Sequence, residues 1–215
     1  MSTLTLRETN IVETDLDGIY ITDGEKLFFM TAEQDEYPSN PRENDCNCCT
    51  ICYVRNRYLG SSKYDNDKDF ADSDDLDDYL VGLKDRGTEF VSVPLYVYVH
   101  SGITISTGSF NDPWDSGCFG VAICTKEQVI EAFGNDTDWR QHAEDIIEDE
   151  IETYDKFLTG ETYVYTVYEY DKAAKEWTLN DTCGGFYSND EDEMLSSYFN
   201  KNYRLIDERE VEQYL

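Results

Sequence analysis

The sequence contains little positive charge. Its 17 Lys and Arg residues stand against 47 Asp and Glu residues, which gives a formal net charge of −30 over 215 residues. Direct binding of nucleic acid needs a basic face or stripe, and the sequence has no cluster of Lys and Arg that could form one. The same shortage disfavours binding to an anionic membrane surface. We therefore expect neither nucleic acid nor a membrane as a direct partner.

Long apolar runs are missing as well. No run approaches the roughly 18 consecutive apolar residues that a membrane-spanning helix requires. The first ten residues, MSTLTLRETN, contain neither the basic segment nor the apolar segment of a secretory signal peptide. These absences predict a cytoplasmic protein, in which the seven Cys residues would be mostly reduced.

Large apolar side chains are nevertheless plentiful, because the sequence contains 17 Tyr, 10 Phe and 3 Trp residues. They can fill the core of a single domain over residues 1–215, and the pattern leaves open an N-terminal β-rich subdomain over residues 1–60. Val93–Thr125 is the least acidic long stretch and predicts two or three buried strands. Cys118 and Cys124 lie in this apolar context, so we expect both to be small core residues.

Turn signals and hydrophobic periodicity predict an α+β fold with a mainly antiparallel sheet built from hairpins. Asp23-Gly24 is a strong hairpin signal between two alternating segments, and Asn180-Asp181 is a second predicted turn. A long acidic amphipathic helix over residues 137–158 and two or three shorter helices, including residues 74–83 and 126–133, are expected to pack on the sheet. Thr125 and Gln128 have the spacing of a capping box, which predicts that the helix over residues 126–133 begins after Thr125.

The predicted long helix separates apolar from acidic side chains. Its apolar residues recur at spacings of three and four and form one stripe: Ala143, Ile147, Ile151, Tyr154 and Leu158. The opposite face is acidic: Asp138, Asp145, Asp149 and Glu152, flanked by Glu148 and Glu150. Like charges four residues apart destabilise a helix by a few tenths of a kcal/mol per pair. A helix selected for stability alone would include more Lys, so we interpret this face as functional.

Two further acidic stretches extend the pattern. One begins the predicted helix over residues 74–83 and the other precedes a short helix near the C-terminus: Asp74, Asp75, Asp77 and Asp78, and Asp190, Glu191, Asp192 and Glu193. Carboxylates one helical turn apart lie about 5–6 Å from each other, comparable to successive phosphates of a nucleic-acid strand. We therefore predict that the three stretches together form a DNA-mimicking face that binds a protein partner. A merely solvated surface is the alternative.

Two residue groups favour a different class of function. Four thiols lie within seven residues and could bind a soft metal such as zinc: Cys46, Cys48, Cys49 and Cys52. No second pair follows them, so we expect a loop with unpaired thiols and no metal. Asp65-x-Asp67-x-Asp69 begins like a calcium loop, but Phe70 stands where such a loop has Gly and Leu76 where it has Glu.

His100 and Asp115 could act as base and acid of a small hydrolytic enzyme, with Ser101, Ser116 or Cys118 as nucleophile. The sequence lacks the G-x-S-x-G signature of a nucleophile elbow. Turn chemistry explains the same residues, and Trp114 is expected to pack across that turn. We therefore expect no catalytic activity and no cofactor.

Several segments together resemble a group of uncharacterised acidic proteins of bacteriophages and conjugative elements, mostly from Gram-positive hosts. They cover much of the chain after residue 35, and the pairing of HSGITIS with PWDSG is their most specific feature: DEYPSNPRE (Asp35–Glu43), RNRYLG (Arg55–Gly60), PLYVYVHSGITISTGSF (Pro94–Phe110), PWDSGCFG (Pro113–Gly120) and ETYDKFLTGETY (Glu152–Tyr163). The chain departs from the group at Cys46–Cys52. The resemblance implies a mobile-element protein, a setting in which small acidic inhibitors of host nucleases are common.

Charge and resemblance together predict an anti-defence protein of the anti-CRISPR or antirestriction type. It would act in the host cytoplasm as a DNA mimic that occupies the basic nucleic-acid-binding channel of a host defence protein or complex. A small metal-binding or hydrolytic enzyme using His100, Asp115 and Cys46–Cys52 is one alternative. A non-catalytic structural or regulatory phage protein, whose charge only secures solubility, is another, and a homodimer stays open.

Overall fold

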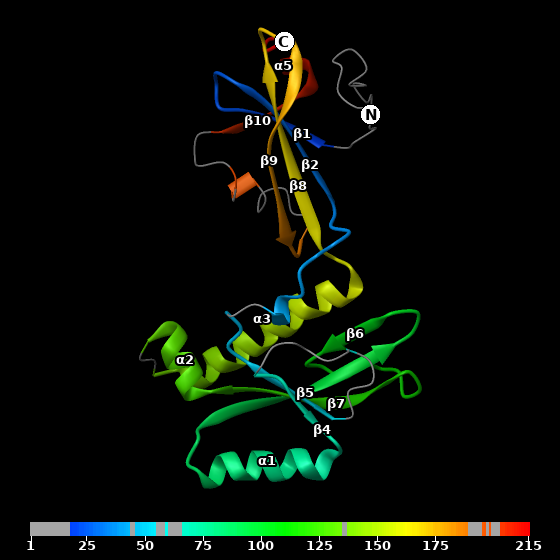
Figure 1. Ribbon diagram of the computed structural model, residues 1–215, viewed down its shortest axis with the longest axis vertical. Helices are drawn as coiled ribbons and strands as arrows, with labels where there is room; N and C mark the ends of the chain where they lie inside the picture. Colours follow the sequence, from blue (N-terminus) through cyan, green and yellow to red (C-terminus); the bar gives the residue numbers. More distant parts are fainter. Residues whose placement is uncertain are drawn as a thin grey trace. The chain divides into compact units, whose positions relative to one another are not determined.

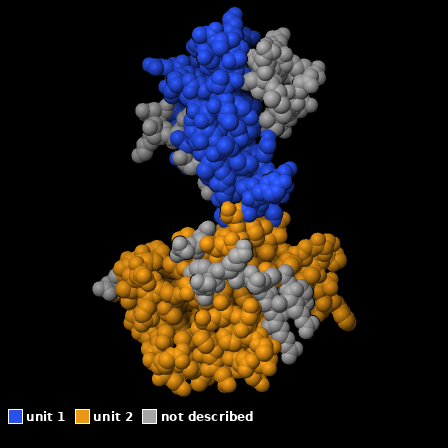
Figure 2. Space-filling model, viewed as in Figure 1, with its two compact units in different colours: residues 1–38, 160–215 blue, residues 39–159 orange. Residues whose placement is uncertain are grey.

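The computed structural model describes residues 18–43, 46–54, 59, 66–134, 137–188, 195–196, 198 and 203–215. Its contacts divide the chain into unit 1, residues 1–38 with 160–215, and unit 2, residues 39–159 (Figures 1 and 2). Each unit contains one five-stranded sheet. The predicted α+β class with mostly antiparallel strands is confirmed, although the strands form two sheets instead of one.

Unit 1 contains a fully antiparallel sheet in the order β10-β1-β2-β8-β9. Its elements are β1 (Gly18–Thr22), β2 (Leu27–Gln34), β8 (Tyr163–Asp171), β9 (Glu176–Phe186), β10 (Arg204–Ile206) and helix α5 (Glu208–Val211). Successive side chains of a strand point to opposite faces. In β2, Phe28 and Met30 join one hydrophobic core, whereas Leu27 and Phe29 join another. Both faces of this sheet therefore carry a core.

The first hairpin follows the prediction. Asp23 Oδ1 accepts the backbone N–H groups of Glu25 and Lys26 at 2.9 and 2.8 Å, and β1 pairs with β2 in register. The second predicted turn, at Asn180-Asp181, is wrong, because β9 runs through it as one strand. Val167 pairs with Asp181 and Tyr168 pairs with Leu179, so Asn180 is the extra residue of a β-bulge.

The division of the chain differs from the N-terminal subdomain of residues 1–60 that the sequence left open. β1 and β2 pair with β10 and β8 from the last third of the chain, whereas β3 (Thr50–Val54) pairs with β7 (Ser116–Thr125) in unit 2. Turn signals are local in sequence, so they cannot identify the distant strand that a hairpin joins.

Unit 2 contains a sheet in the order β4-β3-β7-β5-β6, in which only β3 and β4 are parallel. Besides β3 and β7, its elements are the 3-10 turn η2 (Pro41–Glu43), β4 (Lys68–Phe70), α1 (Ser73–Asp85), β5 (Phe90–Val99), β6 (Ile103–Ser106), α2 (Lys126–Phe133) and α3 (Trp139–Thr159). The stretch Val93–Thr125 supplies most of β5 and all of β6 and β7, as predicted. None of the described helices is both long and apolar enough to cross a membrane.

The sheet of unit 2 has helices on both faces. Ile51 and Tyr53 of β3 pack in the core that also contains the apolar residues of α2 and α3. Cys52, between them, packs instead with Leu76 and Leu83 of α1. Because neighbouring residues of a strand point to opposite faces, α1 lies on one side of the sheet and α3 on the other, as Figure 1 shows.

The capping signals of unit 2 were largely predictable. Thr125 and Gln128 form the expected capping box at the start of α2.

The prediction that Cys118 and Cys124 are core residues is half right, since Cys124 is buried and Cys118 is exposed. Cys118 pairs with Tyr96, whose neighbours Leu95 and Val97 point into the core that faces α3, so Cys118 points away from that core.

The backbone of β3 passes very close to Gly120 in β7. A Cβ atom on Gly120 would lie 2.1 Å from the carbonyl oxygen of Cys52 in the neighbouring strand. We expect Gly120→Ala to lower the free energy of unfolding by about 2 kcal/mol or more, because β3 or β7 must shift to make room for the added methyl group. Gly117→Ala is the matched control, because a Cβ there meets nothing within 4 Å. Urea titration followed by the far-ultraviolet helical signal measures both variants, and equal stabilities would contradict the close approach.

Candidate functional site

The acidic face of α3 is held outward by an apolar stripe on the opposite side of the helix. Trp139, Ala143, Ile147, Ile151 and Tyr154 are buried against the sheet of unit 2, as the periodicity predicted for most of them. The residues of the acidic face are all exposed: Asp138, Asp145, Glu148, Asp149 and Glu152. At 1.5 Å per residue this face extends along about 21 Å of helix.

Few basic residues accompany the acidic residues of α3. The helix contains seven Asp and Glu residues against one Arg and one Lys. Lys156 pairs with Glu152 at 2.8 Å, whereas Arg140 pairs with Glu89 outside the helix at 3.1 Å. Gln141 donates a hydrogen bond to Asp145 at 3.0 Å. The face is therefore strongly negative, and the backbone that displays it is fixed by the buried stripe.

The acidic stretch of α1 does not join the acidic face of α3. Asp72 caps α1 by accepting the N–H groups of Asp74 and Asp75, and Asp77 and Asp78 are exposed. α1 and α3 lie on opposite faces of the sheet (Figure 1). Each helix buries its apolar side against the sheet, so the two acidic sides face away from each other. The prediction of one band built from three stretches is therefore wrong for these two. The third stretch, Asp190–Glu193, lies outside the described residues.

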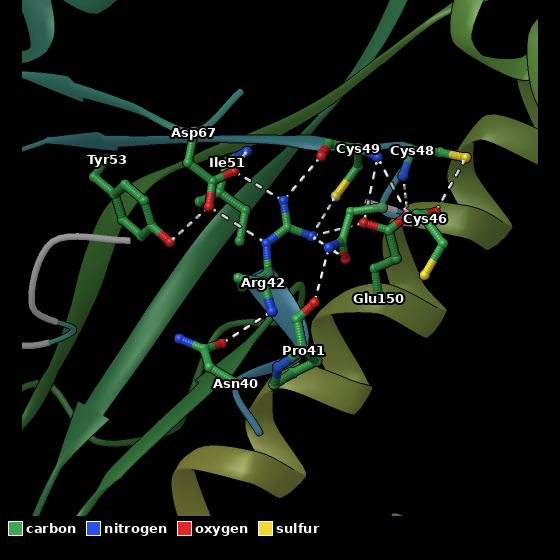
Figure 3. Close-up of polar contacts among 11 residues, drawn as sticks. Asn40, Pro41, Arg42, Cys46, Cys48, Cys49, Ile51, Tyr53, Asp67 and Glu150 are labelled. Atoms are coloured by element: carbon green, nitrogen blue, oxygen red, sulfur yellow. Dashed lines mark hydrogen bonds and ion pairs between the residues drawn. The ribbon is translucent and has the colours of Figure 1, made fainter. Parts of the chain in front are cut away.

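A buried ionic network ties α3 to the sheet, and no pattern in the sequence indicated it. The Arg42 side chain is 0% exposed. Its guanidinium lies between Asp67 and Glu150 (Figure 3). Its Nη2 and Nε donate to Asp67 at 2.8 and 3.3 Å, and its Nη1 donates to Glu150 at 2.7 Å. The carbonyl oxygen of Cys49 and the side-chain oxygen of Asn47 accept further N–H groups of the guanidinium.

The two carboxylates of this network also bind the backbone. Glu150 accepts the N–H groups of Cys48 and Cys49, and Asp67 accepts the N–H of Ile51 at 2.9 Å. Burial alone would lower the pKa of Arg42, but the hydrogen bond to Asp67 and the charges of Asp67 and Glu150 outweigh it and raise that pKa. The guanidinium stays charged, and its contacts join η2, the β3 strand, the loop before β4 and α3.

This network corrects one expectation from the sequence and accounts for one residue of a pattern that the sequence already contradicted. Glu150 was expected to flank the acidic face of α3, but its carboxylate contacts the buried guanidinium of Arg42 instead. Asp67 was the centre of the calcium-like pattern, and it binds that same Arg42. All these contacts are internal to unit 2, so we interpret the network as the fastening of α3 and its loop.

The four clustered thiols do not converge. Cys49 and Cys52 belong to the cores on opposite faces of β3, Cys46 is exposed and Cys48 is half-buried. Burial, followed by the charge of Glu150, raises the pKa of the Cys49 thiol well above its ordinary value, whereas metal ligation requires a thiolate. In the described part of the chain no group of three or more His, Cys, Asp or Glu residues is arranged to hold a metal ion.

His100, in the turn between β5 and β6, and Asp115, in the loop between β6 and β7, do come together. His100 Nδ1 lies 3.3 Å from Asp115 Oδ2, and the two side chains are 66% and 44% exposed. Two of the three candidate nucleophiles point elsewhere: the Ser116 hydroxyl donates to the carbonyl oxygen of Asp112, and the Cys118 thiol contacts the carbonyl oxygen of Gly120. This geometry joins the proposed acid and base but brings neither Ser116 nor Cys118 to the imidazole.

Comparisons of the chain with protein-family models, with curated protein sequences and with solved structures find no match. The resemblance to acidic phage proteins therefore stays an expectation, and the function is argued from the geometry of the described residues.

Removing Arg42 tests the network. We expect Arg42→Met to lower the free energy of unfolding of unit 2 by about 3–5 kcal/mol, because Asp67, 2% exposed, is left as an uncompensated buried charge. Adding Asp67→Asn should restore part of this loss. Arg140→Met is the matched control in an exposed ion pair, where we expect about 1 kcal/mol or less. A loss for Arg42→Met as small as that of the control would show that the network does not fasten α3.

We expect the buried thiols of Cys52 and Cys124 to make the folded protein less stable at high pH. Burial raises the pKa of Cys52 and of Cys124 to about 12 from an ordinary value of 9.0. The unfolded chain therefore loses these protons near pH 9 while the folded chain keeps them up to about pH 12. Stability is fully present below pH 9 and falls as the pH rises through this window. Urea titrations at several pH values should give a shallower fall for Cys124→Ala, whereas the exposed-thiol control Cys183→Ala should follow the wild type.

Proposed function

We propose that the protein is an acidic inhibitor that docks the acidic face of α3 in the basic nucleic-acid-binding channel of a host defence protein or complex. The observation that carries this proposal is a 21-residue helix whose apolar stripe is buried from Trp139 to Tyr154 and whose opposite side carries an exposed row of carboxylates. The carboxylates stand in for the phosphates of a nucleic-acid strand.

Rigidity supports the proposal. A flexible polyanion loses conformational freedom when it docks, whereas a preorganised one does not. Glu150 contacts buried Arg42, and Asp155 Oδ1 accepts the N–H of Ile105 in β6 at 2.7 Å, so two carboxylates of the helix fasten it to the sheet. The remaining ones can then keep fixed spacings, which a channel built for a regular phosphate backbone requires.

The position of α1 limits the form that the interface can take. A partner surface that contacts α3 meets the side of unit 2 opposite to α1, so α1 is not part of the same contact. We therefore restrict the proposed interface in unit 2 to α3. The acidic residues of α1 then serve solubility and the capping of their own helix.

Charge neutralisation on the two helices tests this proposal with a matched pair of variants. The α3 variant is Asp145→Asn, Glu148→Gln and Asp149→Asn, and the α1 variant is Asp77→Asn, Asp78→Asn and Asp85→Asn. All six carboxylates are exposed, and both variants change the net charge by +3. We expect the α3 variant to inhibit about tenfold more weakly than the wild type, because the contacts it loses lie within the basic channel. The α1 variant should inhibit as the wild type does.

The measurement is inhibition of DNA cleavage by a panel of purified RNA-guided nucleases and restriction enzymes. Because the inhibitor competes with DNA, the concentration for half-inhibition should rise in proportion to the DNA concentration for the enzyme that it targets. Inhibition that does not respond to DNA, equal weakening by both variants, or no inhibition across the panel would each contradict the proposal.

A further inference from the structure

Among the described residues of unit 2, Trp114 is the most exposed large hydrophobic side chain. It is 91% exposed, whereas Trp139 and Trp177 are 4% and 7% exposed. The expectation that Trp114 packs across its own turn is therefore wrong. An indole in water forgoes the free energy of burial, and Trp is among the residues enriched at protein interfaces.

The turn that carries Trp114 is fixed by hydrogen bonds. Asp112 Oδ1 accepts the N–H groups of Trp114 and Asp115 at 2.8 and 3.1 Å, and the Ser116 hydroxyl donates to the Asp112 carbonyl oxygen. The carbonyl oxygen of Asp115 accepts the N–H of Val99 at 2.9 Å, which fastens the turn to the end of β5. The exposed indole is therefore presented from a preorganised backbone, which reduces the ordering entropy lost on binding.

Two carboxylates flank the indole. The N–H groups of Trp114 and Asp115 hold the pKa of Asp112 below its ordinary value, so that carboxylate is ionised at neutral pH. Asp115 contacts His100 through one oxygen. An ionised carboxylate has about four acceptor positions, so both groups keep capacity for an outside donor. The turn thus combines an aromatic face with negative charge.

The strongly negative net charge of the chain limits the kinds of partner that can bind the Trp114 turn. A second copy of the chain would bring a net charge of −30 against −30, and an anionic membrane surface is repelled in the same way. A basic protein surface is attracted. Among basic side chains arginine fits best, because a guanidinium can stack on an indole while it donates paired hydrogen bonds to carboxylates.

We propose that the turn of residues 112–115 is a binding site for an arginine side chain on a basic partner protein. Trp114 stacks on the guanidinium, and Asp112 and Asp115 accept its N–H groups. This site is separate from the proposed face of α3 and does not rest on it, so either can fail without the other.

A nine-arginine peptide and a nine-lysine peptide of equal charge are the probes. Since Trp139 and Trp177 are buried, acrylamide quenching of the exposed indole reports on Trp114. We expect the arginine peptide to protect Trp114 from acrylamide at a concentration about threefold or more below that of the lysine peptide. Calorimetry should show that Trp114→Ala weakens binding of the arginine peptide about threefold, and that Trp114→Phe recovers part of it.

Two further variants separate this site from the general acidity of the chain. Asp112→Asn retains the side-chain oxygen that holds the turn and removes its charge, so it should weaken arginine binding while the melting temperature stays unchanged. Phe133→Ala removes another exposed aromatic side chain of unit 2, 66% exposed, and should leave binding unchanged. Equal affinities for the two peptides, or wild-type affinity in Trp114→Ala, would overturn the proposal.

Discussion

The position of α3 depends on the buried guanidinium of Arg42. Asp67 and Glu150 bind it from the loop before β4 and from the middle of the helix, and both carboxylates also accept backbone N–H groups of the β3 segment. An unpaired charge at this depth would be strongly unfavourable, so the three side chains are interdependent. The direction in which the rest of α3 displays its carboxylates follows from this fastening and from the apolar stripe.

The carboxylates of α3 repel one another, and this repulsion opposes the folding of the helix. Two of its seven acidic residues, Glu150 and Asp155, turn inward. They accept the backbone N–H groups of Cys49 and Ile105, and their charge stabilises the packing there. The other five are exposed and repel one another. Burial of the stripe from Trp139 to Tyr154 offsets that repulsion. The same arrangement that allows the helix to fold makes its outer face a rigid polyanion.

Local patterns predicted much of the fold. The spacing of Ala143, Ile147 and Ile151 identified the buried side of α3, and the Thr125 capping box marked the start of α2. Relations between distant segments were not predictable. Nothing local indicates that α1 and α3 cover opposite faces of one sheet, or that a loop arginine pairs with Asp67 and Glu150, because these contacts join residues separated by 25 and 108 positions. The exposure of Trp114 likewise depends on tertiary neighbours that a turn signal does not reveal.

The proposed function rests on one surface, the acidic face of α3, acting in place of phosphates. Displacement of counter-ions by charge pairs makes such binding strongly dependent on salt. The most direct measurement is the dependence of the logarithm of the binding constant on the logarithm of the salt concentration, for the wild-type protein and its target nuclease. We expect a steep negative slope that becomes shallower by up to about three when Asp145, Glu148 and Asp149 are neutralised, and that is unchanged when three carboxylates of α1 are neutralised instead. A flat wild-type slope, or the same change for both helices, would contradict the role of α3 as a phosphate mimic.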